Sequence, residues 1–353
     1  MEKMLNCNSK TLEKLFIDSH EWNTVIKNLN HVRVEEKREE LELKDFADPR
    51  SVWPIIEEAG INVHYETSVL KQLTSEGKLA STYPRDLFVA NVDDATAKKL
   101  SGRNGLFVTS QDNPDLNQII RPVLTLDLEQ GQHFTWHDCF LCLKESPSTP
   151  VNSLVIIDRY LFVKYGLHGW IDGIQNIKRI LSEALPSVFD DIFDVLLITS
   201  EDRWDPRAKS FKRIVDLLYS ECQKLRTYDV NIELLIIGSK GDKRIWDESH
   251  DRRIISNYYR IAASKGFFAF VGEKCNEVFR SQIITIDCAY SNINNKYAQL
   301  YGFPVRGYDS TLLEISKFIS NPGKSPEDYR FYKNGIEQRD LSNFSNRIVL
   351  KQT

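Results

Sequence analysis

The sequence predicts an α/β protein with two successive sheet-forming regions. Short apolar runs alternate with amphipathic helical patterns along most of its 353 residues, which is typical of sheets covered by helices. Three of the runs are almost continuous in Val, Ile and Leu, which indicates strands buried on both faces. We therefore expect an N-terminal α/β module, then an α/β/α sandwich, then a helical C-terminal tail.

The N-terminal module is expected to cover residues 1–145, and its type is unknown. Apolar residues at helical spacing predict a helix over 9–30, and a charge-dense stretch with an exposed face follows it. Asp93 is expected to cap a helix at its N-terminus. From residue 48 the pattern alternates between strands at 60–67, 85–92 and 105–110 and helices at 68–77 and 93–102.

Two further strands joined at 129–131 are expected in the region 119–144. The second strand carries soft metal ligands at His133, His137, Cys139 and Cys142, which raises the alternative of a zinc site. Because alternate residues of a strand point to opposite faces, Cys139 and Cys142 are expected to be reduced and metal-free. A stoichiometric zinc signal that is lost together with stability on mutating Cys139 would contradict this expectation.

The second domain is expected at residues 151–290, after a linker at 145–152 that contains Pro and Ser. Helices are expected at 172–185 and at 205–225, the latter opened by Asp205 and Pro206. The runs at 154–157, 195–198 and 234–237 are expected to be adjacent parallel strands of one sheet, because a helix separates each run from the next. Residues 291–353 form the expected tail, with a helix at 310–320.

Composition limits the classes of protein that fit. The formal net charge is −4, so a basic surface for nucleic acid must be local. The sequence has no apolar run long enough for a membrane span and no signal-peptide core at its start, and its six cysteines are sparse. We expect a cytoplasmic protein. A glycine-rich phosphate loop, a dinucleotide fingerprint and a Ser-His-Asp signature are absent from the sequence, and we expect no cofactor and no metal.

The stretch SHDRRIISNYY, residues 249–259, is the main functional candidate. It contains His250, Arg252 and Asn257 in the spacing His-x-Arg-x-x-x-x-Asn. This spacing resembles the His-x-Lys-x-x-x-x-Asp motif of phospholipase D-type domains, and the order of elements over about 151–290 is similar. The degenerate C-terminal domain of microtubule-interacting-and-transport proteins is more similar still, since it has His-Asp-Arg-x-Ile followed by a glycine and an aromatic, as at 265–268 here.

The resemblance implies a phosphodiester site, but two positions depart from the active pattern. Arg252 replaces the lysine and can still bind phosphate with two hydrogen bonds. Asn257 replaces the acid and cannot act as a carboxylate that stabilises a cationic histidine. A second such motif is absent, so catalysis would require a dimer that brings two copies of His250 to one phosphate. The motif is therefore a catalytic site, a site that only binds phosphate, or an ion-paired strand edge.

The surroundings of the motif favour binding. Residues 238–265 contain seven Lys and Arg against four Asp and Glu. Aromatic residues among them could stack on bases, or the stretch could be a solvated basic loop with aromatics that face the core. The candidate phosphate-binding residues are Arg252, Arg253, Asn257, Lys243 and Arg244, and the candidate stacking residues are Trp246 and Tyr258.

Acidic residues offer two weaker alternatives. Glu201, Asp202 and Asp205 follow a buried strand and could hold a metal or could cap a helix. Asp86 and Asp93 flank another strand and outline an acidic pocket. Asp158 follows the first apolar run of the second domain, where it could pair with Arg159, cap a turn or act beside His250.

The sequence thus favours a non-catalytic component that binds phosphate or nucleic acid within a larger assembly. Bacterial defence or DNA processing is the setting suggested by analogy of fold. The alternative is a dimeric phosphodiesterase or nuclease that uses His250. A second alternative is a protein-interaction scaffold. The expected partners are a nucleic acid and another protein or a second copy of the chain.

Overall fold

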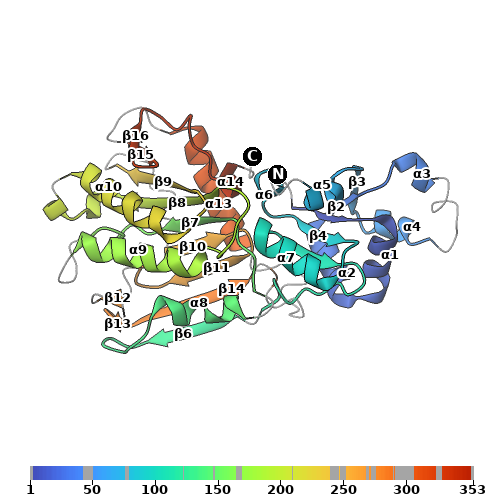
Figure 1. Ribbon diagram of the computed structural model, residues 1–353, viewed down its shortest axis with the longest axis horizontal. Coiled ribbons are helices and arrows are strands. Elements are labelled where there is room, and N and C mark those ends of the chain that lie inside the picture. Colours follow the sequence, from blue (N-terminus) through green and yellow to red (C-terminus); the bar gives the residue numbers. More distant parts are fainter. Residues whose placement is uncertain are drawn as a thin grey trace.

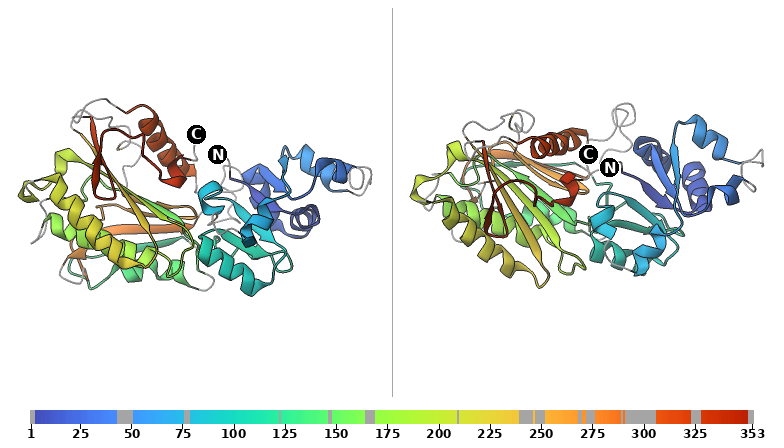
Figure 2. Two further views of the ribbon diagram at one scale, coloured as in Figure 1. Left: turned by 45° about the horizontal axis from the view of Figure 1, so that its top comes forward. Right: turned by 90° about the horizontal axis from the view of Figure 1, so that it is seen from above.

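The protein was analysed as a computed structural model of the whole chain. It describes residues 3–42, 51–75, 79–121, 123–145, 148–163, 169–208, 210–238, 246, 252–267, 270–271, 276–288, 290, 306–322 and 328–350. Figures 1 and 2 show two sheets with helices around them, which confirms the α/β class.

The N-terminal sheet has five strands, all parallel to their neighbours, in the order β3-β2-β1-β4-β5. Its strands are β1 (Leu5–Cys7), β2 (His31–Val34), β3 (Asn62–Tyr65), β4 (Leu87–Ala90) and β5 (Phe107–Ser110). Its helices are α1 (Ser9–Asp18), α2 (His20–Leu29), α3 (Arg38–Glu42), α4 (Trp53–Glu58), α5 (Val69–Ser75), α6 (Leu79–Thr82) and α7 (Asp94–Asn104). Apolar residues of α1, α2 and α4 pack on one face of the sheet, and those of α5, α6 and α7 pack on the other.

Local capping explains where helices of this module begin. The side chain of Ser19 accepts the amide of Trp22, which starts a second helix, so the single helix expected over 9–30 is divided into α1 and α2. Asp93 accepts the amide of Thr96 at 2.7 Å, which confirms the predicted cap of α7. The charge-dense stretch after α2 contains the buried strand β2, which its charge pattern did not predict.

The second sheet has nine strands in the order β16-β15-β9-β8-β7-β10-β11-β14-β6. Its strands are β6 (Leu124–Leu128), β7 (Ser153–Ile157), β8 (Phe193–Ser200), β9 (Val230–Ile237), β10 (Arg252–Ser256), β11 (Tyr259–Ala263), β14 (Gln282–Cys288), β15 (Tyr329–Lys333) and β16 (Ile336–Gln338). The expected adjacent parallel strands are confirmed as β7, β8 and β9. The other neighbours pair antiparallel, and β12 (Phe270–Val271) and β13 (Glu277–Val278) form a separate two-stranded ribbon.

Helices cover both faces of the nine-stranded sheet (Figure 2). Apolar residues of α8 (Trp136–Lys144), α9 (Trp170–Ala184) and α10 (Phe211–Cys222) pack on one face. Those of α13 (Arg306–Ser320) and α14 (Arg347–Leu350) pack on the other face, in the same apolar cluster that contains α1 and α2 of the first sheet. Short 3-10 turns η1 (Glu201–Arg203), η2 (Pro206–Ala208) and η3 (Gln223–Leu225) flank α10. The two sheets therefore share part of one core.

The expected domain boundaries differ from this arrangement. β6 pairs with β14, so the nine-stranded sheet already includes residues that precede the expected linker at 145–152. The expected helical tail also supplies β15 and β16, and β15 pairs with β9. Both departures arise from pairings between strands distant in sequence, which a local pattern does not encode.

Two expected elements are wrong. The run around Cys139 and Cys142 is the helix α8 rather than a strand, because Thr135 and Asp138 form a capping box at its start. The argument that a strand would turn Cys139 and Cys142 to opposite faces therefore no longer counts against a zinc site. The metal-free state of these cysteines stays a prediction. The helix expected to begin at Asp205 begins instead at Phe211, where Ser210 is the cap.

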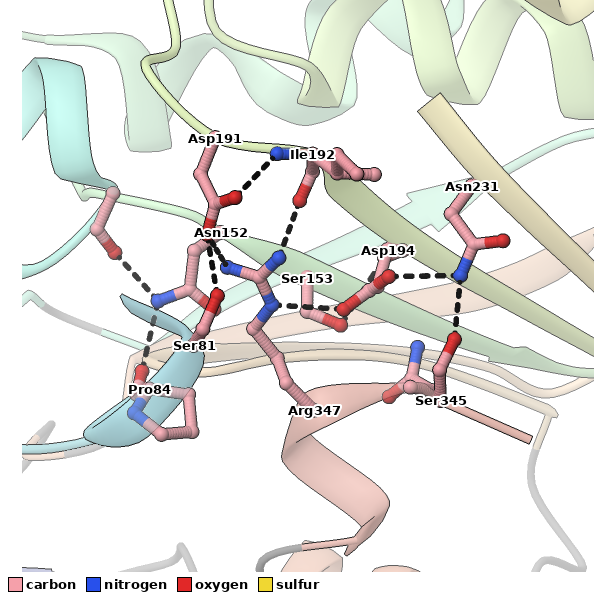
Figure 3. Close-up of polar contacts among 12 residues, drawn as sticks. Ser81, Pro84, Asn152, Ser153, Asp191, Ile192, Asp194, Asn231, Ser345 and Arg347 are labelled. Atoms are coloured by element: carbon pink, nitrogen blue, oxygen red, sulfur yellow. Dashed lines mark hydrogen bonds and ion pairs between the residues drawn. The ribbon is translucent and has the colours of Figure 1, made fainter. Parts of the chain in front are cut away.

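The C-terminal segment is anchored on the edge of the nine-stranded sheet that carries the amino ends of its parallel strands (Figure 3). Arg347 donates to Asp194 at 2.8 Å, to Asp191 at 3.2 Å and to the carbonyl of Ile192. Glu233, in the middle of β9, accepts the amides of Ser345 and Asn346 at the start of α14. These contacts tie the last helix to the centre of the sheet.

Candidate functional site

The carboxyl ends of β7, β8 and β9 lie together at one edge of the nine-stranded sheet, since the strands are adjacent and parallel. Ligands of open α/β sheets bind outside this edge. Asp158 directly follows β7, and Glu201 follows β8. Strand β10 runs antiparallel to β7 and begins at the same edge with Arg252. The fold therefore brings Asp158 and Arg252 together from positions 94 residues apart in the chain.

Asp158 is buried, and its carboxylate is held by two backbone amides. Oδ1 accepts the amide of Tyr160 at 2.8 Å, and Oδ2 accepts the amide of Phe267 at 2.6 Å. Burial raises the pKa of Asp158 to about 6, although the two amides and Arg252 act in the opposite direction. The close approach of the 264–267 turn depends on Gly266, whose φ is +112° and whose added Cβ would lie 2.8 Å from Oδ2.

The guanidinium of Arg252 is held from three sides. Its Nη1 donates to the carbonyl of Ser264 at 2.8 Å. Its Cζ lies 5.1 Å from the centre of the Tyr160 ring, in cation–π geometry. Its Nε lies 4.0 Å from Asp158 Oδ1, and 21% of the side chain is exposed. A fixed, partly exposed guanidinium of this kind can recognise an anion without the entropy cost of ordering a long side chain.

A second arginine lies at the same edge. Arg159 is paired with Asp202, and Asp202 also accepts the hydroxyl of Ser200 at the end of β8. The candidate metal ligand Asp205 is buried and accepts the amides of Trp170 and Arg207. Asp202 and Asp205 therefore satisfy arginine and backbone donors, and in the part of the chain that the structure describes they join no metal-ligand group of three.

The other predicted acidic pair does not come together. Asp86 precedes β4 and Asp93 follows it, so the two lie at opposite ends of this strand. Asp86 is buried and accepts from Arg33 at 3.1 Å and from Asn6 at 3.1 Å. Asp93 caps α7. The predicted acidic pocket is wrong, because each residue has its own structural role.

Strand alternation separates the two arginines of the motif. Arg253 lies on the opposite face of β10 from Arg252 and donates to the hydroxyl of Thr311 in α13. Arg253 therefore does not share a phosphate with Arg252, because the sheet lies between the two guanidinium groups. Trp246 is half-buried and packs against the apolar cluster below α13, and its stacking role stays a prediction.

Asn257 and Tyr258 connect the two sheets rather than contacting a ligand. Asn257 donates to the carbonyl of Gly105 at 2.8 Å and accepts the amide of Asn152 at 3.1 Å. The hydroxyl of Tyr258 donates to the carbonyl of Asp86 at 2.5 Å and accepts the amide of Phe107 at 3.0 Å. Both side chains are 1% exposed. Their predicted roles in phosphate binding and base stacking are therefore wrong.

The remaining predicted residues, His250, Lys243 and Arg244, lie outside the described residues. Sequence reasoning missed the turn at 264–267 and the ring of Tyr160, which together fix Asp158 and Arg252. Two features of the sequence pointed to this site: Asp158 directly follows a buried strand, and a glycine, Gly266, lies in the later turn.

Neither a known protein family nor a curated protein matches the sequence. Among the described residues, none of the helices combines the length and the apolar character needed to cross a bilayer. The site must therefore be interpreted from its own chemistry.

Proposed function

We propose that this chain binds a phosphate-bearing ligand, a nucleic acid, at the carboxyl edge of the nine-stranded sheet and does not cleave it. The bound nucleic acid would belong to a larger assembly that includes another protein or a second copy of the chain. The observation that carries the proposal is the fixation of the Arg252 guanidinium by Ser264, Tyr160 and Asp158 at the edge where α/β sheets bind ligands.

The chemistry of arginine supports phosphate as the ligand. Arginine keeps its charge at any physiological pH, and its planar donors match phosphate oxygens. The second arginine at this edge, Arg159, adds positive charge, although Asp202 is paired with it. His250 precedes Arg252 by two residues in the sequence and would supply a further donor.

A second candidate is a phosphodiesterase or nuclease in which His250 acts with Arg252. The raised pKa of Asp158, about 6, favours it, because a carboxyl group that titrates near neutrality can transfer protons. Binding without cleavage is the better supported function, since both oxygens of Asp158 already accept backbone amides. A general acid or base must lie within hydrogen-bond reach of the proton it transfers, and the two amides each occupy one acceptor position of this carboxylate.

The proposal is tested by measuring binding and turnover together. Single- and double-stranded DNA and RNA are incubated with the protein in chelator, and affinity is measured by fluorescence anisotropy for the wild type, Arg252→Ala and His250→Ala. Arg252→Ala should weaken binding roughly 10- to 100-fold, the cost of one lost charge-assisted hydrogen bond. His250→Ala should weaken it less.

The matched control is Arg103→Ala. Arg103 is a partly exposed arginine that is paired with the carboxylate of Asp190. Asp190 lies shortly before β8 begins, at the opposite edge of the nine-stranded sheet from Arg252. This variant should bind as the wild type does. Turnover that is lost in His250→Ala would support the nuclease instead. Equal affinity of the wild type and both site variants for every nucleic acid would leave only a scaffold role.

A further inference from the structure

Two histidines meet on neighbouring strands of the five-stranded sheet, which contains neither Asp158 nor Arg252. His31 begins β2, and His64 is the third residue of the edge strand β3. The parallel register pairs His31 with Asn62 and Arg33 with His64, so both imidazoles lie on the same face of the sheet. Nδ1 of His31 lies 3.2 Å from Nε2 of His64, and the ring centres are 5.5 Å apart.

This separation fits two ligands of one metal ion. Zinc–imidazole bonds of about 2.0–2.1 Å in a tetrahedral site place two ligand nitrogens about 3.3 Å apart. Without metal, one ring donates its N–H to the other, and the shared proton occupies the space between the two nitrogens. A cation could replace that proton through small rotations of the rings, with no movement of the strands.

The backbone around the pair holds the imidazoles in place. Asn30 ends α2 with a left-handed φ of 60°, which turns the chain directly into β2 at His31. The carbonyl of Asn30 accepts the amide of Asn62 at 2.9 Å, which fixes the start of β3 beside the start of β2. Because the strands are already paired, binding a metal would cost little ordering entropy.

The surroundings determine which ions fit. The pair is at the surface, so aqueous ions reach it. In the described ranges no group of three His, Cys, Asp or Glu side chains could hold a metal, so the two imidazoles are the protein ligands to consider there. Imidazole nitrogens suit Zn²⁺, Ni²⁺ and Cu²⁺ rather than Mg²⁺ or Ca²⁺, and affinity for such a pair is highest for Cu²⁺.

We propose that His31 and His64 form an open two-histidine site for a divalent transition-metal ion, with Cu²⁺ bound more tightly than Zn²⁺. A bound ion would link β2 to the edge strand β3. It would also stabilise the five-stranded sheet in proportion to its concentration above the dissociation constant. The site is independent of the proposed nucleic-acid function, since it shares no residue with it.

The test uses the full chain purified without a histidine tag. Zn²⁺ is titrated calorimetrically into the wild type, His31→Gln, His64→Gln and the control His20→Gln. His20 is an exposed histidine that begins α2 in the same part of the molecule. We expect one Zn²⁺ per wild-type chain, the same in the control, and at least tenfold weaker binding in both site variants. Zn²⁺ should raise the melting temperature of the wild type and not that of His64→Gln.

Electron paramagnetic resonance of the Cu²⁺-loaded protein gives an independent readout. The wild type should show coupling to the nitrogens of two imidazoles, and each site variant should lose one of them. The absence of stoichiometric Zn²⁺ binding by the wild type would overturn the proposal. Binding by His31→Gln and His64→Gln that is as tight as binding by the wild type would also overturn it, because the ion would then be held elsewhere and the two rings would only share a proton.

Discussion

Nε of Arg252 lies 4.0 Å from Oδ1 of Asp158, at the edge of the nine-stranded sheet where β7 ends and β10 begins. The separation is longer than a hydrogen bond. Asp158 is satisfied by backbone amides, and Arg252 is positioned by Ser264 and Tyr160. The carboxylate therefore adjusts the charge beside the guanidinium without occupying its donors, which leaves Arg252 suited to bind an anion.

Asp158 should make nucleic-acid affinity depend on pH. Its pKa is about 6, so it is neutral below that pH and anionic above it. An anionic Asp158 opposes a phosphate at Arg252, and affinity should therefore fall as the pH rises through about 6. Asp158→Asn should raise affinity at about pH 8 and change it little at about pH 5. Anisotropy titrations at both pH values measure this difference.

An unperturbed histidine has a pKa of about 6.5, and protonation of His250 would change affinity in the same direction. The pH series is therefore repeated in His250→Ala, where the effect of Asp158→Asn should persist. An effect of Asp158→Asn that disappears in the His250→Ala background would assign the pH dependence to the histidine.

Gly266 should be needed for nucleic-acid binding as well as for the stability of the fold. Its φ of +112° is unfavourable for any side chain, and a Cβ would press on Asp158. Gly266→Ala should cost about 1–3 kcal/mol of stability and also weaken nucleic-acid binding. Gly60 has a φ of +72° with nothing within 4 Å of an added Cβ, so Gly60→Ala should lower stability in urea denaturation and leave binding unchanged. Equal binding by both variants would contradict the positioning role of Gly266.

Loss of the hydroxyl should lower the stability of the protein at Tyr258 but not at the adjacent Tyr259. Tyr258 makes two hydrogen bonds between the sheets, so Tyr258→Phe should cost about 1–3 kcal/mol, the price of an unsatisfied Phe107 amide and Asp86 carbonyl. The hydroxyl of Tyr259 is equally buried and has no hydrogen-bond partner among the described residues. Tyr259→Phe should be neutral or stabilising. Urea denaturation measures both, and a comparable loss in the two variants would show that an unobserved partner satisfies Tyr259.

Glu233 should make the C-terminal anchor sensitive to pH. Burial raises its pKa to about 7, above its ordinary value of 4.5 in an unfolded chain. The folded state therefore binds the proton more tightly, and the free energy of unfolding should fall as the pH rises from about 4.5 to about 7. Glu233→Gln should remove most of this slope between about pH 6 and about pH 7. Asp158 contributes a slope of the same sign at lower pH, which the variant should retain. An unchanged slope above pH 6 would assign the effect to another group.

Elements with strong local signals were predictable from the sequence. The central strands β7, β8 and β9 are continuous apolar runs, and Asp93 is a cap followed by a helical pattern. The errors arose where local patterns compete with tertiary structure. The helix α8 has the apolar content of a strand, and its capping box decided the outcome. The membership of β6 and β15 in the second sheet depends on pairings across about 150 and 100 residues, as between Leu124 and Ile286 or Lys333 and Glu233.

The candidate site was only partly predictable, for a related reason. Spacing identified Arg252 as a cation at the start of a strand. The same spacing could not reveal that Asn257 and Tyr258 point into the junction between the sheets, because that junction is formed by Gly105, Phe107 and Asp86 from the other module. Asp158 is held by the amide of Phe267, which lies in a turn more than 100 residues later in the chain.

The salt dependence of nucleic-acid affinity tests the central claim most directly, since it counts the phosphates that the protein neutralises. Affinity for the tightest-binding duplex is measured over a series of salt concentrations for the wild type, Arg252→Ala and Arg103→Ala. Loss of one phosphate contact should reduce the slope of log affinity against log salt by about 0.9 in Arg252→Ala, with no change in Arg103→Ala. Parallel lines for the wild type and Arg252→Ala would show that Arg252 contacts no phosphate and would contradict the proposed site.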